Sequence, residues 1–421
     1  MHKKTTLKNG LRVLTVPLKS TNAVTILVLV GTGSKYETKK INGISHFLEH
    51  MFFKGTTKRP TPLDIAEPVE GTGGVMNAFT GEDYTGYYLK VDSAQSELAL
   101  DVVADIYLNS LLPTAEIKKE KGVVTEEINM YKDNPQAHVP EMWNELLYGD
   151  QPAGWNIAGS AKTVSSLTRK NLQDYVNSQY VASNTVICVS GDVKHENIVK
   201  QATKLFKGIR TNDFQQKEPV VERQTQPEVA LEYRKTGQTH IALGVRGVSM
   251  KDERRIEQSI LATLLGGMMS SRLFVQLREN LGAAYYVSTT ADANPDTGAV
   301  VTVAGVTNET IEKAIKAILK EYKNMATTKL SAKELKKGKE YRIGRTVLSL
   351  ESTDAKAEFY GMQELLQQHV VTPPQLYDKI QAVRASEIQK LAAEIFQPQN
   401  LNLVVLGPYK DKKPFQTLLK L

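Results

Sequence analysis

The sequence predicts an α+β protein built from two duplicated domains of similar fold, each a mostly antiparallel sheet with helices packed on one side. Three observations lead to this prediction: the chain has 421 residues, its order of strands and helices occurs twice, and one segment of the first half aligns with one of the second. A chain of this length exceeds a single ordinary hydrophobic core, so two or more domains are expected.

Each half begins with strand patterns and continues mainly with amphipathic helices. In the first half we expect strands at 5–17, 23–32, 75–80, 84–91 and 184–191, and helices at 43–53, 62–71, 94–110, 114–133, 138–148 and 169–179. In the second half we expect strands at 228–234, 239–248, 285–291, 298–305 and 400–407, and helices at 254–266, 270–281, 309–325, 331–349, 353–368, 373–382 and 385–396. Pro68 is expected to bend or shorten its helix, because proline removes a backbone donor.

The repeat is clearest near the end of each half. NLQDYVNSQYVASNTVICVSG at 171–191 aligns with EIQKLAAEIFQPQNLNLVVLG at 387–407, and both read as a helix, a polar turn, an apolar strand and a final glycine. A period of this length indicates duplicated domains and not a solenoid of short repeats. We therefore predict domains at 1–206 and 227–421, joined by the polar linker 207–226.

Composition narrows the class of protein. The net charge of +7 comes without a long Lys/Arg tract, which indicates a solvated basic surface and argues against a nucleic-acid partner. Cys188 is the only cysteine, so neither an intrachain disulfide nor a thiolate metal cluster can form, and its apolar surroundings predict a packing role. The amino terminus lacks a signal-peptide pattern and no stretch has the length of a membrane span, which predicts a cytoplasmic protein without a membrane partner.

The segment GISHFLEHMFFKGT at 43–56 places two histidines and a glutamate in an apolar helix. His46 and His50, at i and i+4, project from one helix face and can bind one tetrahedral zinc ion, while Glu49 flanks that face and can take a proton from water. This His-x-x-Glu-His pattern is the inverted zinc-peptidase motif. The alternative is a pair of hydrogen-bonded packing histidines. Burial of three unpartnered polar groups would be costly, which favours the metal.

Zinc in such a site needs a third protein ligand. The helix within 116–131 offers Glu120 and Glu127, seven residues apart, in an apolar stripe, whereas Glu126 projects about a hundred degrees away and can be solvated. The stripe consists of Ile117, Val124, Ile128 and Tyr131. We predict Glu127 as ligand and Glu120 as its supporting carboxylate. The alternative is an exposed helix face with surface ion pairs.

These residues resemble the pitrilysin (insulysin) family of inverted zinc metallopeptidases, especially its short members related to mitochondrial processing peptidase and their bacterial homologues. The family has a glutamate seventy-seven residues after the second histidine, and that spacing from His50 leads to Glu127. The resemblance covers nearly the whole chain. It implies that His46, His50 and Glu127 bind one zinc ion per chain, with Glu49 as general base and Glu120 in support.

The family also has an arginine and a tyrosine seven residues apart in its second domain. SSRLFVQLRENLGAAYYVST at 270–289 is similar, and the spacing selects Arg278 and Tyr285 over Arg272 and Tyr286. Read from residue type alone, Arg278 would be a solubilising charge and Tyr285 a strand-face aromatic. The resemblance implies instead that both contact the substrate backbone and stabilise the tetrahedral oxyanion.

Another similar stretch, GGVMNAFTGEDYTGYYLKV at 73–91, implies an edge strand that pairs with an extended substrate. Val75 to Phe79 would supply main-chain hydrogen bonds, with Asn77 and Ala78 at the scissile bond, although Phe79 could also be an ordinary core residue.

The prediction from residues and resemblance together is a hydrolase, a zinc-dependent metalloendopeptidase that cuts extended, unfolded peptides. Family members enclose the peptide between two lobes, and this chain supplies one lobe. The resemblance therefore implies a homodimer in which Arg278 and Tyr285 reach the partner's zinc. Two alternatives are a non-catalytic peptide-binding or scaffold subunit and the catalytic half of a heterodimer.

Overall fold

A computed structural model describes residues 2–421, which form two compact units. The first unit extends through Asn129 and also contains 155–218 and 348–371; the second contains 130–154, 219–347 and 372–421. Each unit thus takes a segment from the other half of the chain, and the passage from the first unit to the second after Glu218 lies within the predicted linker 207–226. The two exchanged segments carry one helix each, and each of these helices covers a sheet.

The first unit contains a six-stranded sheet in the order β1-β2-β6-β3-β5-β4. Its strands are β1 (Lys3–Thr6), β2 (Arg12–Pro17), β3 (Ala23–Val30), β4 (Val75–Thr80), β5 (Thr85–Asp92) and β6 (Thr185–Gly191). Only β2 and β6 pair in parallel. The prediction of one strand over 5–17 is wrong. Asn9 and Gly10 turn the chain between β1 and β2, and Gly10 has φ 91°, a conformation that glycine adopts without strain.

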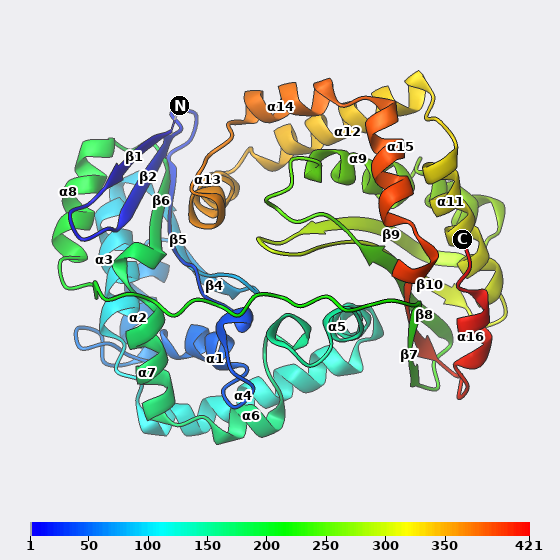
Figure 1. Cartoon of the computed structure of the whole chain (residues 1–421). Coiled ribbons are helices and arrows are strands. Elements are labelled where there is room, and N and C mark those ends of the chain that lie inside the picture. The colour runs from blue at the N-terminus through cyan, green and yellow to red at the C-terminus, as the bar shows by residue number, and fades with distance from the viewer. Residues whose placement is uncertain (1) are drawn as a thin grey trace. The chain divides into compact units, whose positions relative to one another are not determined.

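Side chains of the central strands alternate between two apolar layers. Ile26 and Val28 face the main core, whereas Leu27 and Leu29 face α13 (Thr353–Gln367) on the opposite side of the sheet (Figure 1). Cys188 packs in this second layer, as predicted, and burial raises the pKa of its thiol to about 12. Most helices therefore cover one face, as expected, while a single helix covers the other.

The remaining helices of the first unit position the candidate site. They are α1 (Ile44–Met51), α2 (Pro62–Glu70), α3 (Ser96–Asn109), α4 (Thr114–Asp133, whose last turn belongs to the second unit), α6 (Ala161–Ser166), α7 (Arg169–Gln179) and α8 (His195–Leu205). Pro68 does not end α2, which continues to Glu70 and begins with a capping box at Thr61. Helices α6 and α8 were not predicted from the sequence.

The second unit repeats the topology in the order β7-β11-β8-β10-β9, which matches β2-β6-β3-β5-β4 strand for strand. Its strands are β7 (Glu228–Tyr233), β8 (Gln238–Arg246), β9 (Ala284–Ala293), β10 (Gly298–Thr307) and β11 (Asn402–Gly407). The strands aligned from sequence, β6 and β11, hold the same place in the two sheets, and each pairs in parallel with one neighbour. The duplicated α+β fold is confirmed.

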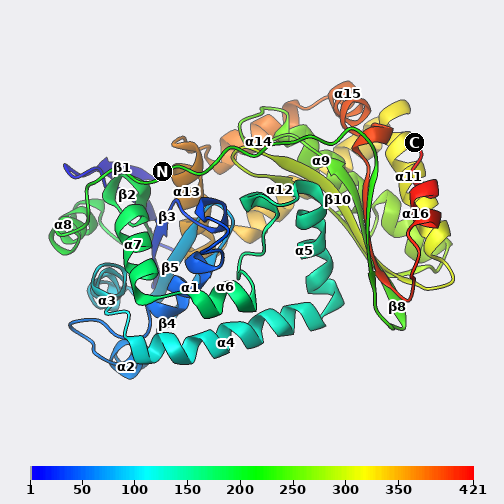
Figure 2. The ribbon, with the colours of Figure 1, turned by 60° about the horizontal axis from the view of Figure 1, so that its bottom comes forward.

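Helices cover both faces of this second sheet as well. They are α5 (Pro135–Tyr148), α9 (Arg255–Gly266), α10 (Arg272–Phe274) with a π-helical continuation (Val275–Asn280), α11 (Ile311–Thr327), α12 (Ala332–Ser349), α14 (Pro373–Ala382), α15 (Ala385–Ile395) and α16 (Lys413–Leu418). Figure 2 shows α5 beside the strands, where Val139 and Trp143 pack on Ala242 and Val404. Within residues 2–421, no helix combines the length and apolar character needed to cross a bilayer.

Candidate metal centre

The short helix α1 is anchored at its amino end by a buried carboxylate. Glu37 accepts hydrogen bonds from the backbone N–H groups of Gly43 (2.7 Å) and Ser45 (2.9 Å) and from Asn42 Nδ2 (2.9 Å). Gly43 precedes the helix with φ 96°, which places these N–H groups around the carboxylate. Burial raises the pKa of Glu37 to about 7, although the hydrogen bonds oppose the shift. Glu37 therefore caps α1 from a preceding loop.

The two faces of α1 have different surroundings. Phe47, Leu48 and Met51 are fully buried in the main core of the first unit. His46 and His50 remain half-buried on the other face, and their rings lie edge to face with centroids 4.7 Å apart. This spacing follows from the i, i+4 relation of the two histidines on one helix.

The structure brings Glu127 of α4 to the two histidines. One candidate ligand atom from each of the three residues lies within 4.8 Å of the other two. Glu127 Oε2 is 3.6 Å from His46 Nε2 and 3.4 Å from His50 Nε2. Two ligands of a tetrahedral zinc ion, each about 2.0–2.1 Å from the metal, lie about 3.4 Å apart. The donor set and its spacing therefore fit zinc.

A second layer of polar contacts fixes the orientation of His50. Glu120, only 4% exposed, lies with Oε1 2.8 Å from His50 Nδ1, while its Oε2 accepts from Lys54 Nζ at 2.8 Å. The contact at Nδ1 leaves Nε2 of His50 facing Glu127. Glu120 thus occupies the predicted supporting position, and Lys54 balances its charge.

The charge balance of the cluster favours a cation. Burial raises the pKa of Glu120, but the hydrogen bonds with His50 and Lys54 outweigh it, so the pKa of this carboxyl lies below its usual value. His46 lowers the pKa of Glu127. Burial lowers the pKa of His50, yet the contact with Glu120 and the nearby carboxylates raise it overall. The carboxylates are held in the ionised form that binds metal.

Within the described part of the chain, His46 lacks a supporting contact like the one that Glu120 makes with His50. Its Nδ1 is buried and has no hydrogen-bond partner among residues 2–421. Burial of this polar atom without a partner costs free energy, while Nε2, on the opposite side of the ring, is the atom that faces Glu127.

Glu49 lies beside an exposed edge of the first sheet. Thr80, the last residue of β4, donates its hydroxyl to Glu49 Oε2 at 2.5 Å, and α1 contacts β4. β4 is the terminal strand of its sheet and pairs only with β5, so its outer edge has no strand partner within the described part of the chain. Glu49, the candidate general base, is thus hydrogen-bonded to the strand that the resemblance predicts to bind the substrate.

The predicted substrate-binding residues occupy different environments along β4. Val75 is 55% exposed and Asn77 is exposed, while Ala78 is half-buried. Asn77 Oδ1 accepts a hydrogen bond from the Ala78 N–H at 2.8 Å, so this side chain lies along its own strand. Phe79 is half-buried and packs near Tyr84, with ring centroids 6.0 Å apart, which agrees with its alternative role as a core residue.

In the second unit, Arg278 and Tyr285 lie together. Arg278 Nη1 donates to the Tyr285 carbonyl at 2.6 Å, and its guanidinium lies 5.7 Å from the Tyr285 ring centroid. Tyr285 is 69% exposed, near the start of the edge strand β9. Arg278 belongs to the π-helical turn that replaces the end of the predicted helix 270–281. Both side chains are therefore accessible from solvent.

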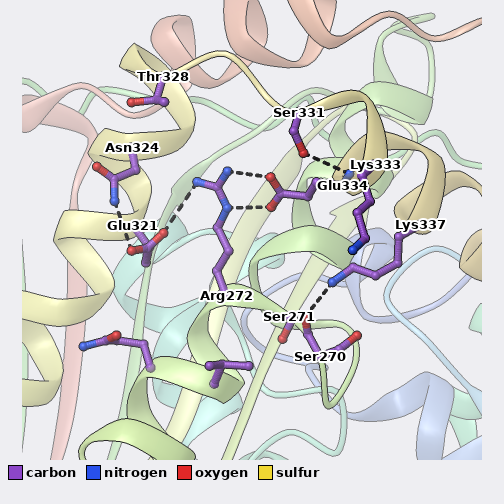
Figure 3. Close-up of a pocket in the computed structure, with 12 residues that line it drawn as sticks. Ser270, Ser271, Arg272, Glu321, Asn324, Thr328, Ser331, Lys333, Glu334 and Lys337 are labelled. Atoms are coloured by element: carbon purple, nitrogen blue, oxygen red, sulfur yellow. Dashed lines mark hydrogen bonds and ion pairs between the residues drawn. The ribbon is translucent and has the colours of Figure 1, made fainter.

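The neighbouring Arg272 and Tyr286 instead contact other side chains of the second unit. Arg272 makes a bidentate pair with Glu334 (2.7 and 2.9 Å) and lies 3.5 Å from Glu321, at the centre of a pocket of about 660 Å³ (Figure 3). Tyr286 is half-buried, with its hydroxyl 3.0 Å from His240 Nδ1. Of the two arginines and two tyrosines in this segment, Arg278 and Tyr285 are the exposed ones.

Three residues that support α1 and its polar side chains, Lys54, Glu37 and Thr80, were not predicted from the sequence. Lys54 follows His50 by four residues, a spacing that could have suggested it. Glu37 and Thr80 carry no comparable signal, because the contacts of each depend on a loop or a strand folding onto α1. The stripe on α4 is shorter than predicted, since Tyr131 is 43% exposed, whereas Glu126 is exposed as expected.

Comparison with known proteins agrees with this geometry. Residues 12–161 match the insulinase family model (peptidase family M16), and residues 166–341 match the model of the M16 inactive domain. In the second unit, α9 follows β8 as α1 follows β3 in the first. Its sequence, RIEQSILATLLG, contains no histidine, which agrees with the match to an inactive domain.

Two curated relatives are named as uncharacterized zinc proteases. YmxG of Bacillus subtilis is 35% identical over 97% of this chain and 98% of its own length. A protein of Streptomyces coelicolor is 33% identical over 98% of this chain and 90% of its own. A crystal structure of a protease from Helicobacter pylori superposes with a TM-score of 0.89 at 25% identity, covering 96% of this chain and 99% of that one. The chain therefore belongs to the insulinase (M16) family of zinc proteases.

Proposed function

We propose that this protein is a zinc-dependent endopeptidase that hydrolyses extended peptides. The observation that supports it best is the convergence of His46 Nε2, His50 Nε2 and Glu127 Oε2, with Glu49 on the same helix. Zinc, when bound by these atoms, would supply a Lewis acid that acidifies water and polarises a peptide carbonyl.

Glu49 would act as the general base. Its carboxylate takes a proton from the attacking water and passes it to the leaving amine. The Thr80 hydroxyl holds one carboxylate oxygen, which limits the orientations of Glu49 and leaves the other oxygen for this proton transfer. Glu120 and Lys54 act one layer further out, where they keep His50 in the tautomer that binds metal through Nε2.

The open edge of β4 supports an extended peptide as substrate. Main-chain hydrogen bonds along Val75 to Phe79 would add the substrate to the sheet as a further strand, with Asn77 and Ala78 at the scissile bond. A folded protein cannot offer a free strand of this kind, so unfolded segments are expected to be cut. Arg278 and Tyr285 would contact the substrate backbone and stabilise the oxyanion.

Purified protein should contain one zinc ion per chain and cleave quenched fluorescent peptides until phenanthroline removes the metal. Glu49→Gln should retain zinc and lose turnover, because glutamine cannot accept the proton. Glu126→Gln makes the same charge change at an exposed position of α4 and should remain active. An active Glu49→Gln enzyme, or wild-type protein that binds zinc and cleaves no peptide in a broad library, would favour the non-catalytic subunit instead.

We further propose a homodimer that shares its active sites. Chains carrying Glu49→Gln retain Arg278 and Tyr285, whereas Arg278→Ala chains retain the metal centre. Mixing the two inactive variants should restore part of the activity if the pair acts on the partner's zinc. Failure to regain activity in mixtures that demonstrably exchange subunits would show that each chain completes its own site or that the pair has another role.

A further inference from the structure

Arg278 and Tyr285 both lie at irregular points of the backbone. Arg278 belongs to the π-helical turn Val275–Asn280, which is wider than a turn of α-helix. In β9, the neighbours of Tyr285 on either side pair with consecutive residues of β10, so Tyr285 is the extra residue of a β-bulge. A π-helical turn and a β-bulge each change the direction of a side chain, and both are frequent at functional sites.

The residue after the bulge is anchored across three strands. Tyr286 faces Gly305 on β10, and Gly305 faces His240 on β8. A side chain at Gly305 would clash with the Tyr286 ring, so this glycine gives the ring the space to lie across β10. The Tyr286 hydroxyl then reaches His240 Nδ1 at 3.0 Å. This contact holds the register beside the bulge and therefore the position of Tyr285.

Phe274 supports the guanidinium of Arg278. It precedes Arg278 by four residues, about one helical turn, and its ring centroid lies 5.4 Å from the guanidinium carbon. Phe274 is half-buried and packs against the core of the second unit, so its ring is fixed while part of it stays accessible to the arginine. The same guanidinium lies 5.7 Å from the Tyr285 ring centroid and donates to the Tyr285 carbonyl at 2.6 Å. Contacts with two rings and a carbonyl thus hold an exposed and otherwise flexible side chain.

We propose that Phe274 is a positioning residue, which holds the Arg278 guanidinium in the direction required to contact the substrate. The negative face of an aromatic ring attracts a guanidinium. Because the ring of Phe274 has no hydrogen-bond acceptor, it holds Arg278 without using any of the five N–H donors of the guanidinium. A charged donor that is oriented before the substrate arrives can stabilise an oxyanion without reorganisation. Phe274 has this role only if Arg278 acts on the substrate as proposed above.

The contact can be measured by NMR of the full chain after arginine-selective isotope labelling. The side-chain signal of Arg278 is identified by its absence from Arg278→Ala, and ring currents should displace it from the range of ordinary exposed arginines. Phe274→Leu keeps an apolar side chain without a ring, so it should move this signal toward the ordinary range, whereas Phe274→Tyr should leave it in place. Val275→Ala changes the next residue, which lines the pocket around Arg272, and should not move the signal. An unchanged Arg278 signal in Phe274→Leu would overturn the proposal.

Peptide hydrolysis then distinguishes a positioning residue from one that only stabilises the fold. Phe274→Leu should lower kcat about two- to fivefold, as expected for loss of one exposed cation–π contact, with KM within about twofold of wild type and the same zinc content. Phe274→Tyr should restore the wild-type kcat, because a tyrosine ring offers a similar face to the guanidinium.

Failure of the proposed function and failure of the role of Phe274 give different results. If Arg278→Ala is as active as wild type, the proposed role of Arg278 fails, and the role of Phe274 fails with it. If Arg278→Ala is inactive while Phe274→Leu keeps the wild-type kcat, only the role of Phe274 is overturned. The same holds if Phe274→Tyr loses as much activity as Phe274→Leu, because the ring face would then not be what matters.

Discussion

Replacement of Glu120 by glutamine tests whether the metal centre depends on its second layer of contacts. The side chain is 4% exposed and joins His50 Nδ1 and Lys54 Nζ, each at 2.8 Å. Glutamine has nearly the same shape but no charge, so it can hold His50 less firmly and leaves Lys54 without its ion pair. Loss of such a support weakens metal binding by about 10–100-fold, which corresponds to about 1.4–2.8 kcal/mol.

Zinc affinity of the Glu120→Gln variant can be measured by competition with a chromophoric chelator at neutral pH. The matched control is Glu126→Gln on the same helix, which makes the same chemical change at an exposed position and should leave the affinity unchanged. Circular dichroism should confirm that both variants fold. An affinity for Glu120→Gln within about twofold of wild type, or an equal loss in Glu126→Gln, would refute the role assigned to Glu120.

Three further changes probe the surroundings of the site. Thr80→Val should lower kcat about tenfold at unchanged zinc content, because Glu49 loses a hydroxyl donor at 2.5 Å; an unaltered kcat would contradict this. Because the pKa of Glu37 is raised from 4.5 to about 7 in the folded protein, folded wild type retains a proton between these pH values that the unfolded chain releases. The free energy of unfolding of wild type should therefore fall by up to about 3 kcal/mol as the pH rises from about 4.5 to 7. Urea unfolding of Glu37→Gln should lack this pH dependence. Arg59→Met should cost about 3–5 kcal/mol, because the buried Asp105 loses its cation at 2.7 Å and keeps only neutral hydrogen-bond donors. Lys58→Met, at an exposed position, should cost less than about 1 kcal/mol.

Local patterns in the sequence predicted many of the helices and strands and two of the candidate metal ligands. Helices α4 and α7 and the strand β4 have the predicted bounds, because a regular alternation of apolar and polar residues sets each of them independently of distant contacts. The i, i+4 spacing of His46 and His50 placed both rings on one face for the same reason.

Features that depend on chain reversal were decided by the tertiary structure. The alternating pattern over 5–17 did not reveal the turn between β1 and β2, although the Asn9–Gly10 pair is typical of one. Likewise, the helical pattern of 353–368 predicted α13 but not the sheet that it covers. A segment's own periodicity shows which face is apolar, while its partner is set by the path of the rest of the chain.

The metal centre combines the two kinds of information. Residue type and spacing identified the two histidines, whereas only folding brings Glu127 within 3.6 Å of them and joins Glu120 to His50 and Lys54. Arg272 and Arg278 are the same residue type six positions apart, yet one is held between two glutamates and the other is exposed beside Tyr285. Sequence alone determines which groups a chain can offer. Tertiary contacts determine which of them are neutralised and which stay free, because charge pairing and desolvation depend on neighbours that are distant in sequence.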